Sequence, residues 1–116
     1  RNGAVIGDKC KIGQGVEIKN TIVMDDSKIP HLSYVGDSVI GEKVNLGAGT
    51  ICANLRHDSE NIKSMVKGKL VDTGRRKLGA IIGDDVQTGI NTSIYPGRKI
   101  FSGNTTSPGE VVKKDK

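Results

Sequence analysis

Residues 40–52, IGEKVNLGAGTIC, repeat a pattern with a period of six residues. Ile40, Leu46 and Cys52 mark the period, Gly follows the first two, and Val44 and Thr50 stand four places after them. A six-residue unit is too short for a helical repeat, but it suits a short strand followed by a tight turn. The stretch therefore predicts a parallel β-solenoid, in which the marked side chains fill the interior of the coil.

The same period extends through most of the chain, with two interruptions. Residues 27–33, SKIPHLS, shift the register by four, and residues 55–78 form an insert rich in charge. Within the insert, the segment MVKGKLV predicts a hairpin that turns at Lys67 and Gly68. The other predicted interior positions are Ile6, Cys10, Ile12, Val16, Ile18, Ile22, Met24, Tyr34, Ser38, Ile82, Val86, Thr88, Thr92, Ile94 and Ile100.

Composition agrees with a narrow coil and excludes several other classes. The 116 residues include 16 Gly but only two Tyr, one Phe and no Trp, which argues against a helical bundle or an aromatic-filled barrel. The formal net charge is +5, yet so few aromatic side chains cannot form a stacking platform for single-stranded nucleic acid. No apolar run is long enough to cross a membrane. We therefore expect neither a nucleic-acid nor a membrane partner.

The two cysteines, Cys10 and Cys52, form no CxxC pair and fall at predicted interior positions. We interpret them as buried thiols in a reducing, cytoplasmic compartment rather than as a disulfide or metal ligands. No cluster of metal-ligating residues suggests a metal site.

Two segments carry a resemblance to a known family: HLSYVGDSVIGEKVNLGAGTICAN (31–54) and GRRKLGAIIGDD (74–85). They resemble the left-handed parallel β-helix acyltransferases. They closely resemble one branch, the C-terminal acetyltransferase half of bifunctional N-acetylglucosamine-1-phosphate uridylyltransferase/glucosamine-1-phosphate N-acetyltransferase. The long basic insert is similar to the archaeal sugar-1-phosphate nucleotidylyltransferase type.

The resemblance implies an all-β, left-handed parallel β-helix with one inserted basic loop. It also implies a homotrimer with sites between subunits. We expect residues 1–116 to form one hexapeptide-repeat acetyltransferase domain. Because the chain starts with Arg rather than Met, we expect it to be a piece of a longer protein, and the resemblance implies a nucleotidylyltransferase domain before it.

His31 matches the catalytic general base of the family. Imidazole side chains titrate near neutral pH and can accept a proton from an amine. A lone histidine is more often structural, but this one lies beside Pro30 in the segment that breaks the repeat. Asn54, the last residue of the segment that His31 begins, matches a residue that contacts the reacting amine and acetyl-CoA.

Further candidates follow from the same resemblance. The residues expected to bind the sugar phosphate are Arg1, Lys19, Tyr34, Asn45 and Lys63. Those expected to bind acetyl-CoA are Ala48, Asn54, Lys77, Ile90 and Pro108. Each also has a plain structural explanation: a solvated charge, a side chain that fills the coil, or a turn residue.

Three positions depart from the bacterial pattern. Leu55 replaces an aromatic residue, Ile90 replaces Ser and Pro108 replaces Ala. The last two changes are tolerable if the family contacts run through the backbone, whereas side-chain contacts there would be lost.

The resulting hypothesis is acetyl transfer from acetyl-CoA to glucosamine 1-phosphate, or to galactosamine 1-phosphate, in UDP-N-acetylglucosamine synthesis. His31 would deprotonate the amine, with no covalent acyl-enzyme and no metal. A different class remains open: a non-catalytic solenoid that serves trimerisation or regulation of a sugar-1-phosphate nucleotidylyltransferase. A γ-class carbonic anhydrase needs three zinc-binding histidines, whereas the chain has only His31 and His57.

Overall fold

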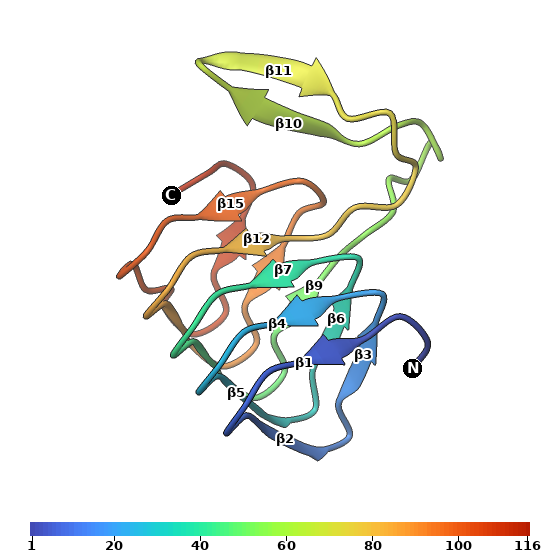
Figure 1. Cartoon of the computed structure of the whole chain (residues 1–116). Helices are drawn as coiled ribbons and strands as arrows, with labels where there is room; N and C mark the ends of the chain where they lie inside the picture. Colours follow the sequence, from blue (N-terminus) through green and yellow to red (C-terminus); the bar gives the residue numbers. More distant parts are fainter.

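The computed structural model describes residues 1–116 as a coil of short strands with no helix. Three parallel sheets form its faces, each named here after its first strand (Figure 1). The β1 sheet contains β1 (Val5–Ile6), β4 (Ile22–Val23), β7 (Val39–Ile40), β12 (Ile81–Ile82) and β15 (Lys99–Ile100). The β2 sheet contains β2 (Lys11–Gln14), β5 (Lys28–His31), β8 (Asn45–Leu46) and β13 (Gln87–Thr88). The β3 sheet contains β3 (Glu17–Lys19), β6 (Tyr34–Gly36), β9 (Ile51–Cys52), β14 (Ser93–Ile94) and β16 (Val111–Val112).

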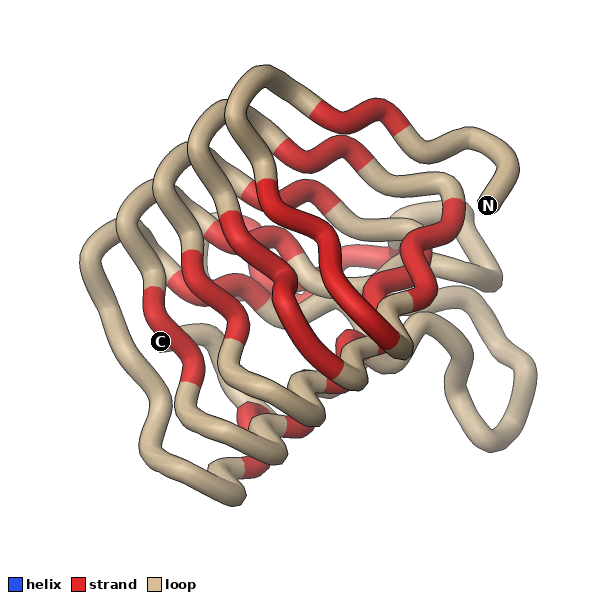
Figure 2. The backbone as a smooth tube through the Cα atoms, turned by 90° about the horizontal axis from the view of Figure 1, so that it is seen from below, coloured by secondary structure: helices blue, strands red, loops and turns tan.

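Successive coils stack in register, so that equivalent residues line up along the solenoid (Figure 2). Val5 pairs with Ile22 and Ile22 with Val39, so the early coils are of equal length. Ile81 pairs with Lys99, which makes the last full coil one residue longer than these. Stacked strands lie about 4.8 Å apart. The predicted all-β parallel solenoid with one inserted basic loop is confirmed.

Aliphatic side chains fill the coil, and small hydroxyl residues occupy its corners. Fourteen buried residues form one core: Ile18, Val23, Ile29, Val35, Ile40, Val44, Leu46, Cys52, Ala80, Ile82, Val86, Ile94, Ile100 and Val112. At the corners, buried hydroxyls bridge neighbouring coils, as between Thr50 and Thr88 (2.8 Å) and between Thr92 and Thr106 (2.7 Å). The interior is too narrow for rings, which explains the scarcity of aromatic residues.

Three predicted interior positions are wrong. Ile22 and Met24 are exposed and Tyr34 is half-buried on the outer surface, whereas the neighbouring Val23 and Val35 are buried. The reason is that two corners are one residue shorter than the period of six. Buried residues are only five apart from Ile18 to Val23 and from Val35 to Ile40.

The register shift predicted at residues 27–33 is also wrong. In this segment β5 pairs regularly with β2, and Ile29 is fully buried. The two short corners account for the whole offset. Ile6 and Ile12 do point inward, but they are 41% and 40% exposed because they lie on the outermost coil that the structure describes.

The insert leaves and re-enters the solenoid at one place. Leu55 and Lys77 form an antiparallel bridge at its base. β7, which precedes the insert in the sequence, pairs directly with β12, which follows it. Its strands β10 (Lys63–Val66) and β11 (Lys69–Asp72) form the predicted hairpin. Lys67 (φ 49°) and Gly68 (φ 81°) turn it with two left-handed residues.

The hairpin projects over the C-terminal end of the stack (Figure 1). Lys99 Nζ donates a hydrogen bond to the Met65 carbonyl at 2.8 Å, and the Arg98 guanidinium donates to the Lys63 carbonyl. These contacts attach the hairpin to the last full coil of the solenoid, at the start of β15.

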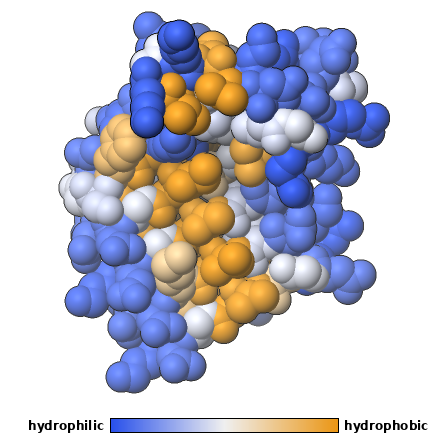
Figure 3. All heavy atoms as spheres, turned by 45° about the horizontal axis from the view of Figure 1, so that its top comes forward, coloured by the Kyte–Doolittle hydropathy of each residue, from blue (hydrophilic) through white to orange (hydrophobic).

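An apolar column runs along the outer face of the β1 sheet towards this hairpin (Figure 3). Four residues form the column through successive strand pairings: Val5, Ile22, Val39 and Ile81. Val5 is 61% exposed.

The structure contains no helix capable of spanning a bilayer.

Candidate functional site

Most of the predicted site residues fall into two groups at the two edges of the β3 sheet, and the first group also contains two residues that were not predicted. We call the first group the amide cluster: Lys19, Asn20, Tyr34, Asp37 and Asn54. It lies where β3, β6 and β9 end. We call the second group the histidine column: His31, Ala48, Ile90 and Pro108. It lies at the corner between the β2 and β3 sheets, one residue per coil.

The amide cluster is held together by side-chain hydrogen bonds. Asn54 Nδ2 donates to Tyr34 Oη at 3.0 Å and to Asp37 Oδ2 at 2.7 Å. Asn20 Nδ2 donates to Asp37 Oδ1 at 2.7 Å, and Lys19 Nζ lies 3.7 Å from Asp37 Oδ2. Tyr34, Lys19 and Asn54, predicted from separate parts of the sequence, therefore belong to one connected group.

Asp37 and Asn20 were not among the predicted site residues. Asn20, Asp37 and Asn54 follow one another at equal spacing, one full early coil apart, so they occupy the same position on three successive coils. This spacing is the sequence signal that could have identified them. A uniform period of six does not reveal this spacing, because each early coil contains a corner that is one residue shorter.

Asp37 is ionised in this setting. Burial by itself would raise the pKa of Asp37, but the amide hydrogen bonds of Asn20 and Asn54 and the charges of Lys19 and Arg75 lower it below its usual range. The cluster therefore contains one carboxylate surrounded by donors and cations at neutral pH.

Gly36 leaves the space in which Tyr34 and Asn54 meet. A Cβ atom at residue 36 would collide with Tyr34 Oη and with Asn54 Nδ2. The absence of a side chain lets the Tyr34 ring lie along the strand and reach the end of the next coil.

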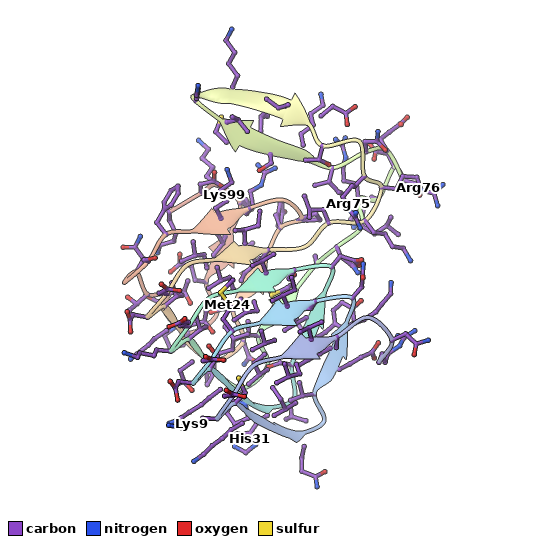
Figure 4. The ribbon with its side chains drawn as sticks, viewed as in Figure 1. Lys9, Met24, His31, Arg75, Arg76 and Lys99 are labelled. Carbon is purple, nitrogen blue, oxygen red and sulfur yellow. The ribbon has the colours of Figure 1, made fainter.

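Positive charge surrounds the amide cluster. The Arg1 guanidinium pairs with Glu17, one strand away from Tyr34. Leu78 N donates to Asn54 O at 3.0 Å, which places neighbouring Lys77 beside Asn54 rather than beside the histidine column. Arg75 and Arg76 lie at the base of the insert on the same side (Figure 4).

An open cavity of about 510 Å³ separates the solenoid from the hairpin next to Asn54. Ala53 and Leu55 flank it on the solenoid side, and Tyr95 adds an exposed ring. Its polar lining includes Arg56, His57, Lys63 and Arg98. Lys63, predicted to bind the sugar phosphate, therefore faces this cavity from β10.

Backbone hydrogen bonds between successive coils hold the residues of the histidine column in place. The Gly49 N–H donates to the His31 carbonyl (3.4 Å), Asn91 N–H to Ala48 (2.8 Å) and Gly109 N–H to Ile90 (2.8 Å). The N–H groups of Ala48 and Ile90 make no hydrogen bond within the chain.

The His31 side chain is exposed and has no hydrogen-bond partner in the chain. It lies at the opposite side of the solenoid from Arg75 and Arg76 (Figure 4). Asn45 is also exposed, on the same β2 sheet as His31. A single chain thus places His31 and Asn45 away from the amide cluster, across the β3 sheet.

Neither cysteine is positioned as a nucleophile. Both are free, Cys52 is fully buried as predicted, and Cys10 is half-buried. Burial raises the pKa of the Cys52 thiol to about 12, so that thiol stays protonated. No group of three or more His, Cys, Asp or Glu side chains is arranged to hold a metal ion.

Comparison with known families decides the relationship of this chain. The model of the GMPPB C-terminal domain family matches residues 2–98. The chain belongs to this family.

Two relatives are named as bifunctional proteins, and one of these names gives two activities. The chain is 57% identical over 111 residues to a bifunctional sugar-1-phosphate nucleotidylyltransferase/acetyltransferase of Sulfurisphaera tokodaii, covering 96% of this chain and 28% of that protein. It is 46% identical over 115 residues to a bifunctional protein GlmU of Methanococcus vannielii, covering 99% of this chain and 28% of that protein. The chain thus spans just over a quarter of the length of these relatives, and the predicted resemblance is confirmed.

A solved structure of a hexapeptide-repeat acetyltransferase from Vibrio cholerae, complexed with acetyl coenzyme A, is also similar. It is 16% identical, with a TM-score of 0.28, over 94% of this chain and 64% of that one. A likeness this low carries no argument about the site.

Proposed function

We propose that this chain transfers the acetyl group of acetyl-CoA to the amine of an amino-sugar 1-phosphate. Glucosamine 1-phosphate is the first candidate substrate and galactosamine 1-phosphate the second, in the synthesis of UDP-N-acetylglucosamine. The observation that carries the proposal is the amide cluster, in which Lys19, Tyr34 and Asn54 meet. The word acetyltransferase in the name of the Sulfurisphaera relative supports it.

In this proposal the sugar phosphate binds at the cationic edge. Lys19 and Arg1 supply charge for the phosphate, with Lys63 across the cavity and Tyr34 as a polar contact. Asn45, which lies across the β3 sheet in a single chain, would reach the sugar from a neighbouring copy. Asn54 orients the amine. His31 takes a proton from the amine as its nitrogen attacks the thioester carbonyl. The C–S bond then breaks, and coenzyme A leaves as a thiolate that is protonated, while the sugar keeps the new amide.

The histidine column suits a thioester substrate. Ala48 and Ile90 offer two unengaged N–H groups on successive coils, beside His31. Such donors can hold the pantetheine amides or the oxyanion that forms at the carbonyl. Pro108, at the next position, has no N–H and offers its ring and its carbonyl. Lys77, which lies beside Asn54, would meet a phosphate of a coenzyme bound between two copies.

The separation of the two groups favours a site shared between copies. A neighbouring copy that sets its histidine column against this amide cluster would bring His31 to Asn54. A homotrimer closes such head-to-tail contacts into a ring. We further infer that a nucleotidylyltransferase domain accompanies this domain in the longer protein, because the name of the Sulfurisphaera relative gives both activities and this chain covers 28% of that protein.

The main test measures thiol release from acetyl-CoA in the presence of glucosamine 1-phosphate or galactosamine 1-phosphate. We expect release that depends on the amino sugar and favours one of the two. Release that is absent with both sugars would leave the alternative, a non-catalytic domain for trimerisation or regulation.

Mixed oligomers test the shared site. His31→Ala and Asn54→Ala chains should each keep only a small, measurable fraction of the activity alone, and co-expression should restore more of it, because one interface in a mixed trimer then contains both residues. If co-expression restores nothing while mixed trimers form, each site lies within a single chain.

A further inference from the structure

Asp37 is the only buried carboxylate of the molecule. It follows β6 in the left-handed conformation (φ 50°), where its N–H donates to the Lys19 carbonyl at 2.9 Å and its carbonyl accepts from Gly79 at 2.8 Å. The backbone therefore fixes Asp37 between two neighbouring coils, and the side chain has little freedom to move.

This carboxylate determines which way the Asn54 amide points. An ionised carboxylate can only accept hydrogen bonds, so the Asn54 atom at 2.7 Å from Asp37 Oδ2 must be the NH₂ nitrogen. The second proton of that nitrogen goes to Tyr34 Oη at 3.0 Å. Both protons are then used, and Asn54 Oδ1 has no partner in the chain.

Asn54 consequently presents an acceptor to a ligand and no donor. An acceptor suits the N–H of an amine, whereas it would repel the oxyanion of the tetrahedral intermediate. Asn20 reinforces the arrangement from the other side, because its NH₂ group occupies Asp37 Oδ1. The hydrogen bonds that join Asn20, Asp37 and Asn54 therefore have a fixed direction, because both amides donate to the carboxylate between them.

We propose that Asp37 is a positioning residue, which locks the Asn54 amide with Oδ1 towards the substrate and so makes the site select a hydrogen-bond donor, the amino group of the sugar. This inference rests on the proposed function. Without the carboxylate, the Asn54 amide can rotate and present either end.

The test is a double-mutant cycle of Asp37→Gly and Asn54→Ala. Glycine tolerates φ 50°, so Asp37→Gly removes the carboxylate without adding backbone strain. We expect Asp37→Gly to lower kcat/KM about 10- to 100-fold, because the amine loses its orientation. In the Asn54→Ala background the same change should have no further effect.

Two more variants separate positioning from folding. Asp37→Asn restores an acceptor and makes an asparagine ladder that stacked strands tolerate, so it should regain part of the activity. Asn20→Gly suits the φ of 49° at that residue, leaves Asp37 charged and frees Oδ1, so its loss should be smaller than that of Asp37→Gly. Asp84→Gly is the matched control: it removes a corner carboxylate that accepts from Glu42 N at 2.8 Å outside the site, and transfer should be unchanged.

Binding of glucosamine 1-phosphate by titration calorimetry distinguishes this inference from the proposed function. If the wild type binds the sugar without transferring acetyl, and Asp37→Gly weakens binding, the proposed function fails and the role of Asp37 stands. If the wild type transfers acetyl, the role of Asp37 is overturned by full kcat/KM in Asp37→Gly or by losses that multiply in the double variant. Absence of both binding and transfer in the wild type overturns both.

Discussion

The two edges of the β3 sheet hold their polar groups in different ways. At one edge, the amide cluster is fixed by side-chain hydrogen bonds around a buried carboxylate. At the other edge, the histidine column is fixed only through its backbone, and the His31 side chain is exposed without a partner.

This difference shows which edge of the β3 sheet can bind a ligand in a single chain without rearranging its side chains. The amide cluster has little to reorganise, because Tyr34 and Asn54 are already held in place. The imidazole of His31 can still rotate, and only a ligand or a neighbouring copy would fix it. Four predictions test this contrast, from the largest expected effect to the smallest.

His31→Ala should lower kcat for acetyl transfer about 10²- to 10⁴-fold, the usual contribution of a general base. The melting temperature should stay the same, because the side chain is exposed and makes no hydrogen bond. Gln14→Ala, at the same position on the preceding coil, is the matched control and should leave kcat unchanged. A His31→Ala variant with wild-type kcat would remove the histidine from the mechanism.

Gly36→Ala should lower kcat/KM about 10- to 100-fold, because the new methyl group displaces Tyr34 Oη and Asn54 Nδ2 without removing either of them. The control is Gly68→Ala at the hairpin tip, where a Cβ has free space but φ is 81°. That variant should lose about 1–2 kcal/mol of stability through the left-handed backbone and keep its activity. Equal activity losses in both variants would argue against a preformed amide cluster.

Ile90→Ala should change the KM for acetyl-CoA by about twofold or less, the effect of an ordinary surface substitution. We expect this because the N–H of Ile90, and not its 53% exposed side chain, offers the contact. Steady-state kinetics with varied acetyl-CoA gives the answer. A tenfold rise in KM would show that the side chain itself binds the coenzyme.

The pH dependence of stability should report on Asp37. Its pKa is lowered in the folded state, so its stabilising contribution is full above the ordinary Asp pKa of about 3.9 and is lost as the pH falls through the folded value. The stability difference between wild type and Asp37→Asn should therefore shrink as the pH falls below about 4. Thermal unfolding between pH 6 and pH 2.5 measures it, and a constant difference would mean that Asp37 is not ionised.

Much of the architecture was predictable from local pattern. The solenoid, the insert at residues 55–78 and the Lys67–Gly68 turn follow from spacing and turn chemistry. The errors at Met24 and Tyr34 have one cause. A period counted along the sequence assumes equal corners, whereas the two corners that close after β3 and β6 use one residue fewer.

The candidate site was predictable only in its separate members. Lys19, Tyr34, His31 and Asn54 were identified by resemblance, residue by residue. Asp37 was missed because its role depends on Asn20 one coil before it and Asn54 one coil after it, and the length of a coil sets that distance.

The sequence by itself determined that the chain coils, most of the side chains that fill the coil and where the insert leaves it, because these depend on alternation and turns within a few residues. The tertiary structure alone decided that Asn20, Asp37 and Asn54 stack, that the Asn54 NH₂ group donates to Asp37 and Tyr34, and that His31 lies across a sheet from it. Those features depend on the register between coils, and register is a property of stacked strands rather than of any one segment.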